Sequence, residues 1–161
     1  MNRLASLVAA CGALLLGACA SFDRDWQAAA ARPVRAADRV ATAWDGKWTS
    51  EKHRLPNGTA AGGRLRCIFT RQDATHYRAR FHANWLCFAT GYEATFTTRP
   101  RSGGIDFRGE QDLGAIFGGV YRYEGRVTRD RFLARFASRY DHGTFAMSRP
   151  AEGPTPGRLT P

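Results

Sequence analysis

Alternation of apolar and polar side chains is the feature of this sequence that most constrains its fold. The alternation recurs between Trp44 and Ser148 with a period of two residues. It is clearest over residues 121–127, where Tyr121, Tyr123, Gly125 and Val127 alternate with Arg122, Glu124 and Arg126. A period of two is typical of a β-strand, whereas a helix has a period of about 3.6 residues. The pattern therefore predicts an all-β domain.

Short strands are expected to follow one another along this domain, separated by turn-forming residues. Residues 64–69 and 77–82 predict a hairpin with one apolar and one largely basic face, and residues 72–75 form its turn. Residues 83–88 are more uniformly apolar and are interpreted as either a buried strand or a crossing segment. Further strands are expected at 44–48, 92–97, 105–109, 121–127, 132–139 and 144–148. About eight short strands predict a small antiparallel meander, either a barrel or a sandwich.

The inward parity of these strands is rich in Phe, Tyr, Ala and Gly. Mixed large and small side chains can fill a narrow barrel or leave a ligand cavity. Five aromatic residues near the expected barrel ends are candidates for lining such a cavity, and the alternative is that they belong to the core. These residues are Trp48, Trp85, Phe117, Tyr121 and Tyr123.

The N-terminus has the three parts of an export signal. Arg3 supplies a positive charge, residues 4–16 are apolar, and Gly17 and Ala18 are small. The apolar run is too short to span a bilayer, which requires about 20 residues. Leu16-Gly17-Ala18-Cys19 resembles the lipobox of bacterial lipoproteins. The alternative is an ordinary secretory signal that is cleaved near Ala18 or Ala20.

The lipoprotein resemblance implies that Cys19 is acylated and becomes the first residue of the mature chain. Several acyl chains hold a protein stably at a membrane. Ala20 and Ser21 follow Cys19, with no Asp, which by the same resemblance implies delivery to the outer membrane, facing the periplasm. The expected organisation is a signal at 1–18, a partly helical or disordered tether at 19–43, a β domain at 44–149 and a disordered tail at 150–161. Within the tether, residues 34–40 are expected to be weakly helical after Pro33.

The chain is strongly basic, with 24 Lys and Arg against 14 Asp and Glu and a net charge of +10. Such a balance indicates an anionic partner or simply solvated strand faces in a protein whose basic residues are nearly all Arg. Pairing of the first predicted hairpin places Arg64, Arg66, Arg78 and Arg80 on one face, which is a candidate site for anionic lipid or lipopolysaccharide. An exported lipoprotein is a poor candidate for nucleic-acid binding.

Two cysteines, Cys67 and Cys87, fall within the β domain. In an oxidising compartment they either form a disulfide or remain as two buried thiols. Neither belongs to a Cys-x-x-Cys or Cys-His pattern, so no metal site or cofactor is expected.

No strong catalytic motif is present, and the protein is not expected to be an enzyme. The sequence contains no Gly-x-Ser-x-Gly elbow, no His-Glu-x-x-His and no phosphate-binding glycine loop. Glu110 and Asp112 share a strand parity and are the nearest match to an acid–base pair. Asp141 and His142 are interpreted as turn residues.

Gly46-Lys47-Trp48 is similar to the Gly-x-Trp signature of lipocalins and other calycins. The resemblance implies a calycin-like barrel in which Arg149, after the last strand, packs over Trp48. Together these features predict an outer-membrane lipoprotein that binds an apolar or amphipathic small molecule, or that scaffolds the envelope through another protein. The alternatives are a small periplasmic hydrolase and a binder of anionic lipid.

Overall fold

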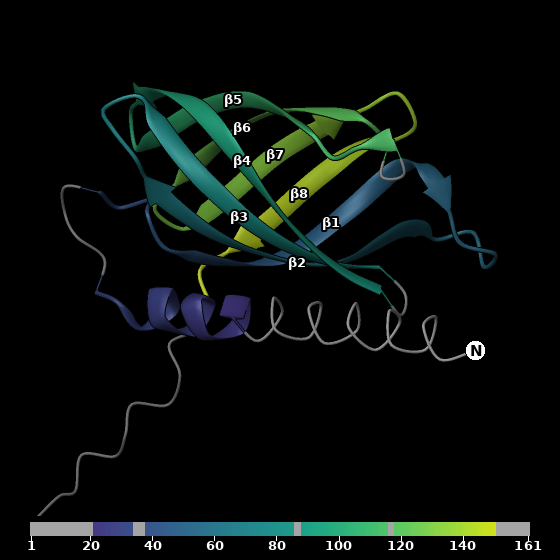
Figure 1. The fold of residues 1–161 in the computed structure, drawn as a ribbon, viewed down its shortest axis with the longest axis horizontal. Helices are drawn as coiled ribbons and strands as arrows, with labels where there is room; N and C mark the ends of the chain where they lie inside the picture. The colour runs from purple at the N-terminus through teal and green to yellow at the C-terminus, as the bar shows by residue number, and fades with distance from the viewer. Residues whose placement is uncertain (1–20, 34–37, 86–87, 116–117, 151–161) are drawn as a thin grey trace, which may run out of the picture.

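Eight antiparallel strands form one closed barrel in a computed structural model that describes residues 21–33, 38–85, 88–115 and 118–150 (Figure 1). Each strand pairs with the next along the chain, and β8 pairs with β1 to close the barrel. The strands are β1 Ala43–Arg54, β2 Ala60–Arg71, β3 His76–Trp85, β4 Phe88–Arg101, β5 Gly104–Asp112, β6 Val120–Thr128, β7 Arg131–Ala137 and β8 His142–Ser148. The prediction of an all-β antiparallel meander is confirmed, and the barrel is the form adopted.

The inward parity of the strands forms a single aromatic core. Trp44, Phe69, Phe81, Phe96 and Phe132 are the largest side chains that are completely buried. Their rings pack edge to face or tilted, as in the pair Phe69–Phe132, whose centroids are 5.5 Å apart at 87°. Such contacts are favourable beyond the area that they bury. The middle of the barrel is therefore filled with side chains.

One end of the barrel is closed by the segment that precedes β1. Val40 is buried in the core, and its carbonyl accepts a hydrogen bond from Trp44 Nε1 at 3.2 Å. Arg149 lies over the Trp44 ring, with its guanidinium carbon 5.8 Å from the ring centroid. The expected packing of Arg149 over Trp48 is therefore wrong. Trp44 has the same strand parity but lies at the end of β1 where Arg149 follows β8.

The wall of the barrel is incomplete between β4 and β5. Their ladder joins Thr97–Arg101 to Gly104–Arg108, and among the described residues no ladder pair joins 88–96 to 109–112. The last ladder pair is Thr97–Arg108, and one residue further an added Cβ at Gly109 would lie 2.6 Å from the Thr95 carbonyl oxygen. A glycine is thus required where β5 still passes close to β4, just beyond the end of the ladder.

Two local predictions differ from the structure. Residues 83–85 end β3 and residue 88 begins β4, with Trp85 paired to Phe88, so the described residues of 83–88 belong to two paired strands; residues 86–87 lie outside the described ranges. Of the helix expected at 34–40 after Pro33, residues 34–37 lie outside the described residues, and residues 38–40 are not helical. The helix instead covers residues 21–31, ahead of Pro33, and is rich in alanine, which favours helix formation.

This helix lies within the predicted tether and packs along the outside of the barrel (Figure 1). Phe22 is 5% exposed and lies against β2 and β3, where it stacks on His82. Within the described residues, no helix has the length and apolar character needed to cross a membrane.

Several predictions concern residues outside the described ranges. They are the signal at 1–18, the lipidation of Cys19, the roles of Cys87 and Phe117, and the tail from residue 151 onward. The backbone of Trp85 ends β3, but its side chain is likewise outside the description.

Candidate functional site

The end of the barrel opposite Val40 carries a cluster of tyrosines. Tyr92 on β4 and Tyr121 on β6 are half-buried and pack against the core, and Tyr123 on β6 is 3% exposed. Tyr123 stacks between the other two, with centroid distances of 6.4 Å to Tyr92 and 6.2 Å to Tyr121. Two of the predicted lining residues, Tyr121 and Tyr123, are therefore in contact with each other.

The hydroxyl of Tyr123 is buried without a hydrogen-bond partner among the described residues. The phenol of the neighbouring Tyr92 is close enough for a weak hydrogen-bond interaction with it, but this contact does not meet normal hydrogen-bond geometry. Burial raises the pKa of the Tyr123 hydroxyl above its usual range, so the group remains a neutral donor. An unsatisfied buried hydroxyl costs about 1–3 kcal/mol, and such groups commonly mark functional sites.

Tyr77 at the opposite end provides a contrast. Its hydroxyl donates to Asp38 Oδ1 at 2.9 Å. Burial, with this bond to Asp38, raises the pKa of Tyr77 to about 12. The closed end thus satisfies its buried phenol with a protein carboxylate, whereas the tyrosine cluster offers Tyr123 none.

Trp48 lies at the same end as the tyrosine cluster. It is half-buried, packs against the core, and donates from Nε1 to the Asn84 carbonyl at 3.0 Å. The bond reaches across β2 at Gly63, where an added Cβ would lie 1.8 Å from that carbonyl oxygen. Glycine at this position therefore allows the indole to hold β1 close to β3. Trp48 is placed as a rim residue rather than as the centre of the core.

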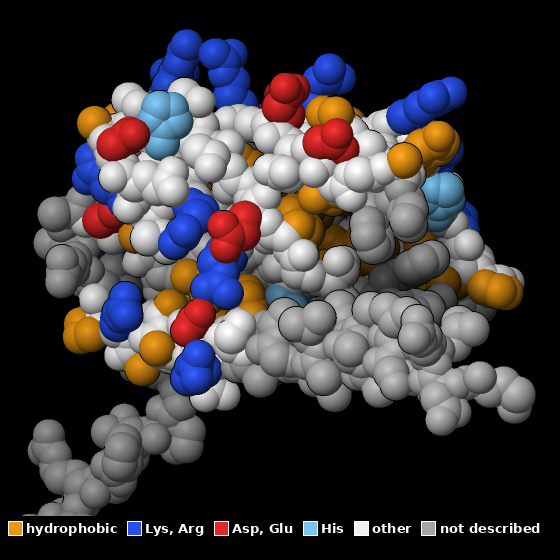
Figure 2. Space-filling model, viewed as in Figure 1, with side chains coloured by type: hydrophobic (Ala, Val, Ile, Leu, Met, Phe, Trp, Pro, Cys, Tyr) orange, Lys and Arg blue, Asp and Glu red, His pale blue; other side chains and the backbone are white. Residues whose placement is uncertain are grey.

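The tyrosine cluster lies beside the incomplete part of the wall. Tyr92 belongs to the half of β4 that has no ladder to β5, and Tyr121 is paired with Gln111 in the corresponding half of β5. Figure 2 shows an opening in this face, between β4 and β5 in the view of Figure 1, in which hydrophobic side chains are visible.

The predicted anion-binding face on β2 and β3 is occupied by the protein itself. Arg64 binds both carboxylate oxygens of Asp45, at 3.0 and 2.6 Å. Arg66 and Arg80 contact Asp23 and Asp25 of the helix, at 2.6 and 2.8 Å. Glu93 lies 3.2 Å from Arg80 and 4.0 Å from Arg78. All four arginines therefore lie beside carboxylates.

Aromatic residues of the helix also lie over the outer face of β2 and β3, which we call the covered wall. The guanidinium carbons of Arg66 and Arg80 lie 5.3 and 5.7 Å from the Phe22 ring centroid, and Arg66 also lies 5.4 Å from Trp26. His82 stacks on Phe22 with centroids 5.0 Å apart. Burial, together with the charge of Arg66, lowers the pKa of His82. The covered wall is therefore the surface on which the protein's own helix docks.

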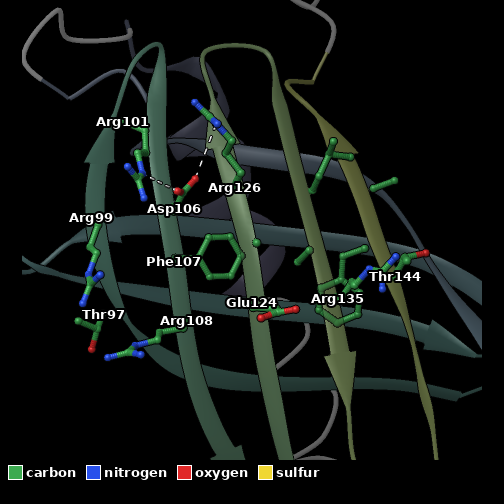
Figure 3. A pocket seen from close by; sticks show the side chains of 15 residues that line it. Thr97, Arg99, Arg101, Asp106, Phe107, Arg108, Glu124, Arg126, Arg135 and Thr144 are labelled. Atoms are coloured by element: carbon green, nitrogen blue, oxygen red, sulfur yellow. Dashed lines mark hydrogen bonds and ion pairs between the residues drawn. The ribbon is translucent and has the colours of Figure 1, made fainter.

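A different set of arginines is open to solvent on the outside of β4 to β8. Figure 3 shows a hollow of about 770 Å³ on this wall, lined by five arginines and two carboxylates among other residues. Arg101 and Arg126 are held by Asp106, at 2.9 and 3.8 Å. Arg99, Arg108 and Arg135 form no ion pair with any described residue.

The candidate catalytic residues do not form a catalytic arrangement. Glu110 is exposed and lies 3.6 Å from Arg122, and Asp112 accepts the Gly114 amide at 2.8 Å. Asp141 accepts from the Ser50 hydroxyl at 2.6 Å, and that same hydroxyl oxygen accepts two backbone amides. The Ser50 hydroxyl is therefore committed to the turn.

Only one of the two cysteines of the β domain lies within the described residues, so the alternative of a disulfide between Cys67 and Cys87 stays a prediction. Cys67 is a completely buried free thiol in the structure. Burial raises the pKa of the thiol well above its usual range. In the described part of the chain, no group of three potential ligand side chains could hold a metal ion.

Sequence reasoning missed Tyr92 and the free arginines of β4 and β5. Tyr92 has the same inward parity as Ala94 and Phe96, and the three inward tyrosines share hydroxyls that need partners when buried. The need of these three inward hydroxyls for hydrogen-bond partners was the sequence signal that could have identified Tyr92. The free arginines had no such signal, because their sequence pattern resembles that of the covered ones.

Comparison with known proteins gives no relative for this chain. No family model, curated protein or solved structure matches it.

Proposed function

We propose that this protein binds a small amphipathic molecule at the tyrosine cluster. The observation that carries the proposal is the Tyr123 hydroxyl, which is buried and makes no hydrogen bond of normal geometry with any described residue. A polar atom of the ligand accepts or donates the missing hydrogen bond, and its apolar part packs on Tyr92, Tyr121 and Trp48.

The same proposal includes attachment to the cell envelope. Acylation of Cys19 anchors the protein in the outer membrane, and the helix at 21–31 keeps the barrel close to that anchor. The support is the Leu16-Gly17-Ala18-Cys19 pattern. Replacement of Cys19 by Ser is expected to release the protein from the membrane fraction. Unchanged membrane association of Cys19→Ser would contradict the anchor.

The binding proposal is tested by native mass spectrometry of the protein purified from its own host. A bound small molecule is expected in the wild-type spectrum. Tyr123→Phe removes only the hydroxyl, and it is expected to weaken binding about tenfold, the value of one lost hydrogen bond. Tyr140→Phe is the matched control, because Tyr140 is 53% exposed and lies outside the cluster. An unliganded spectrum, with no binding of added amphiphiles, would reject the proposal.

A further inference from the structure

Two free arginines lie on the outer wall at the point where the barrel opens. Arg99 on β4 and Arg108 on β5 are both exposed and have no ion pair with any residue that the structure describes. Most other arginines of this wall differ in this respect, since Arg101 and Arg126 share Asp106 and Arg122 contacts Glu110. Arg99 and Arg108 therefore retain their full hydrogen-bonding capacity for an external anion.

Thr97 joins these two arginines into one cluster. Thr97 is directly opposite Arg108 in the ladder, and Arg99 lies two residues further along β4 on the same outer face. Side chains at such positions are close enough to contact a common group. Figure 3 shows the guanidinium of Arg99 and that of Arg108 both directed toward Thr97. Two guanidinium forks and a hydroxyl are well suited to the oxygens of a phosphate.

The cluster lies next to the opening. The Thr97–Arg108 pair is the last of the β4–β5 ladder, and the strands separate beyond Gly109. A second hollow, of about 700 Å³, is also lined by Thr97 and Arg108 and extends to Gly109 and Tyr123. One continuous outer surface thus leads from the arginines to the edge of the unpaired region.

We propose that Arg99, Thr97 and Arg108 hold the phosphate headgroup of an amphiphile whose alkyl chain passes between β4 and β5 to the tyrosine cluster. The inference rests on the proposed function and names its ligand class, a single-chain alkyl phosphate. The headgroup remains on the solvent side, where both arginines are exposed, so no charge is transferred into the core. Charge-assisted hydrogen bonds at the rim provide selectivity, and the buried chain provides most of the affinity.

The test is calorimetric titration of the purified protein with decyl phosphate and with decyl glucoside, both below micelle-forming concentrations. Decyl phosphate is expected to bind about tenfold or more tightly, as two charge-assisted contacts require. The double variant Arg99→Gln with Arg108→Gln is expected to abolish this preference while the affinity for decyl glucoside stays unchanged. Arg131→Gln with Arg139→Gln removes the same charge elsewhere and is expected to preserve the preference.

The outcomes separate the two proposals. Equal affinities for the two amphiphiles, or a preference that survives the Arg99 and Arg108 substitutions, would overturn the headgroup site but leave the tyrosine site intact. Failure of both amphiphiles to bind would reject both proposals. Inorganic phosphate that binds as tightly as decyl phosphate would also overturn the inference, because the chain would then contribute nothing. Circular dichroism of each variant checks that the barrel is folded.

Discussion

The two sides of this barrel use outward-facing arginines in opposite ways. On β2 and β3, Arg66 and Arg80 contact carboxylates of the helix and lie against its aromatic rings. On β4 and β5, Arg99 and Arg108 have no ion pair among the described residues and border a hollow. The ladders differ too, because β2 and β3 are paired at seven positions and β4 and β5 at only five.

The comparison shows that an arginine-rich strand face does not by itself indicate a binding site. The acidic partners of Arg66 and Arg80 are 43 and 55 residues away in the sequence. Once the helix docks, the charge of the covered wall is largely balanced within the molecule. The outer face of β4 to β8, which we call the bare wall, keeps its charge because no acidic segment of the described chain lies over Arg99 and Arg108. An arginine without an ion pair is therefore a better indicator of a binding site than an arginine that is already paired.

The largest expected effect is on the covered wall, at Phe22. Phe22→Ala removes a buried ring that stacks on His82 and lies under two guanidiniums. The free energy of unfolding is expected to fall by about 3–5 kcal/mol, as for other buried phenylalanines, and urea denaturation measures it. Leu133→Ala on the bare wall is the control, since Leu133 is 48% exposed. Wild-type stability of Phe22→Ala would show that the helix is not part of the folded unit.

A smaller loss of stability is expected for Arg66→Gln. The substitution leaves Asp23 without its ion pair and removes a cation from Phe22 and Trp26. We expect a loss of about 1–2 kcal/mol, more than for an exposed pair because the Arg66 side chain is only 16% exposed. A double-mutant cycle with Asp23→Asn measures the coupling directly. A coupling energy of zero would mean that the pair does not hold the helix.

Acidification is expected to weaken the covered wall through His82. Burial first, and then the nearby charge of Arg66, lowers the pKa of His82 below its ordinary 6.5, with Asp23 opposing the shift. The neutral imidazole is thus favoured in the folded state, and its contribution is complete above pH 6.5 and lost as the pH falls through the lowered pKa. The melting temperature is expected to fall between about pH 7 and pH 5. His82→Gln should remove this pH step, and His142→Gln, at an exposed position, should retain it.

The smallest effect is expected on the bare wall. Arg108→Gln removes an exposed side chain that has no ion pair with described residues, so stability should change by no more than about 0.5 kcal/mol. Urea denaturation of Arg108→Gln and Arg66→Gln under the same conditions compares their free energies of unfolding. A loss above about 1 kcal/mol would show that Arg108 has a structural partner, and the contrast between the two walls would then fail.

Much of the fold could be predicted from local pattern, but much of the candidate site could not. Leu65, Cys67 and Phe69 face inward as their alternation indicates, and β2 and β3 form the expected hairpin. Tyr121 and Tyr123 were identified as possible lining residues, and the structure adds Tyr92. The missing partner of Tyr123 could not be predicted, because it depends on which residues of other strands reach its hydroxyl.

The strands, their inward faces and the meander can be read from the amino-acid sequence. Each of these follows from side-chain alternation and turn residues, which act over a few neighbouring positions. Three features depend on the folded molecule: β8 closes on β1, the ladder between β4 and β5 ends at Arg108, and the helix covers Arg66 rather than Arg108. These depend on contacts between residues distant in the chain, where the geometry of the whole barrel selects among partners that look alike in sequence.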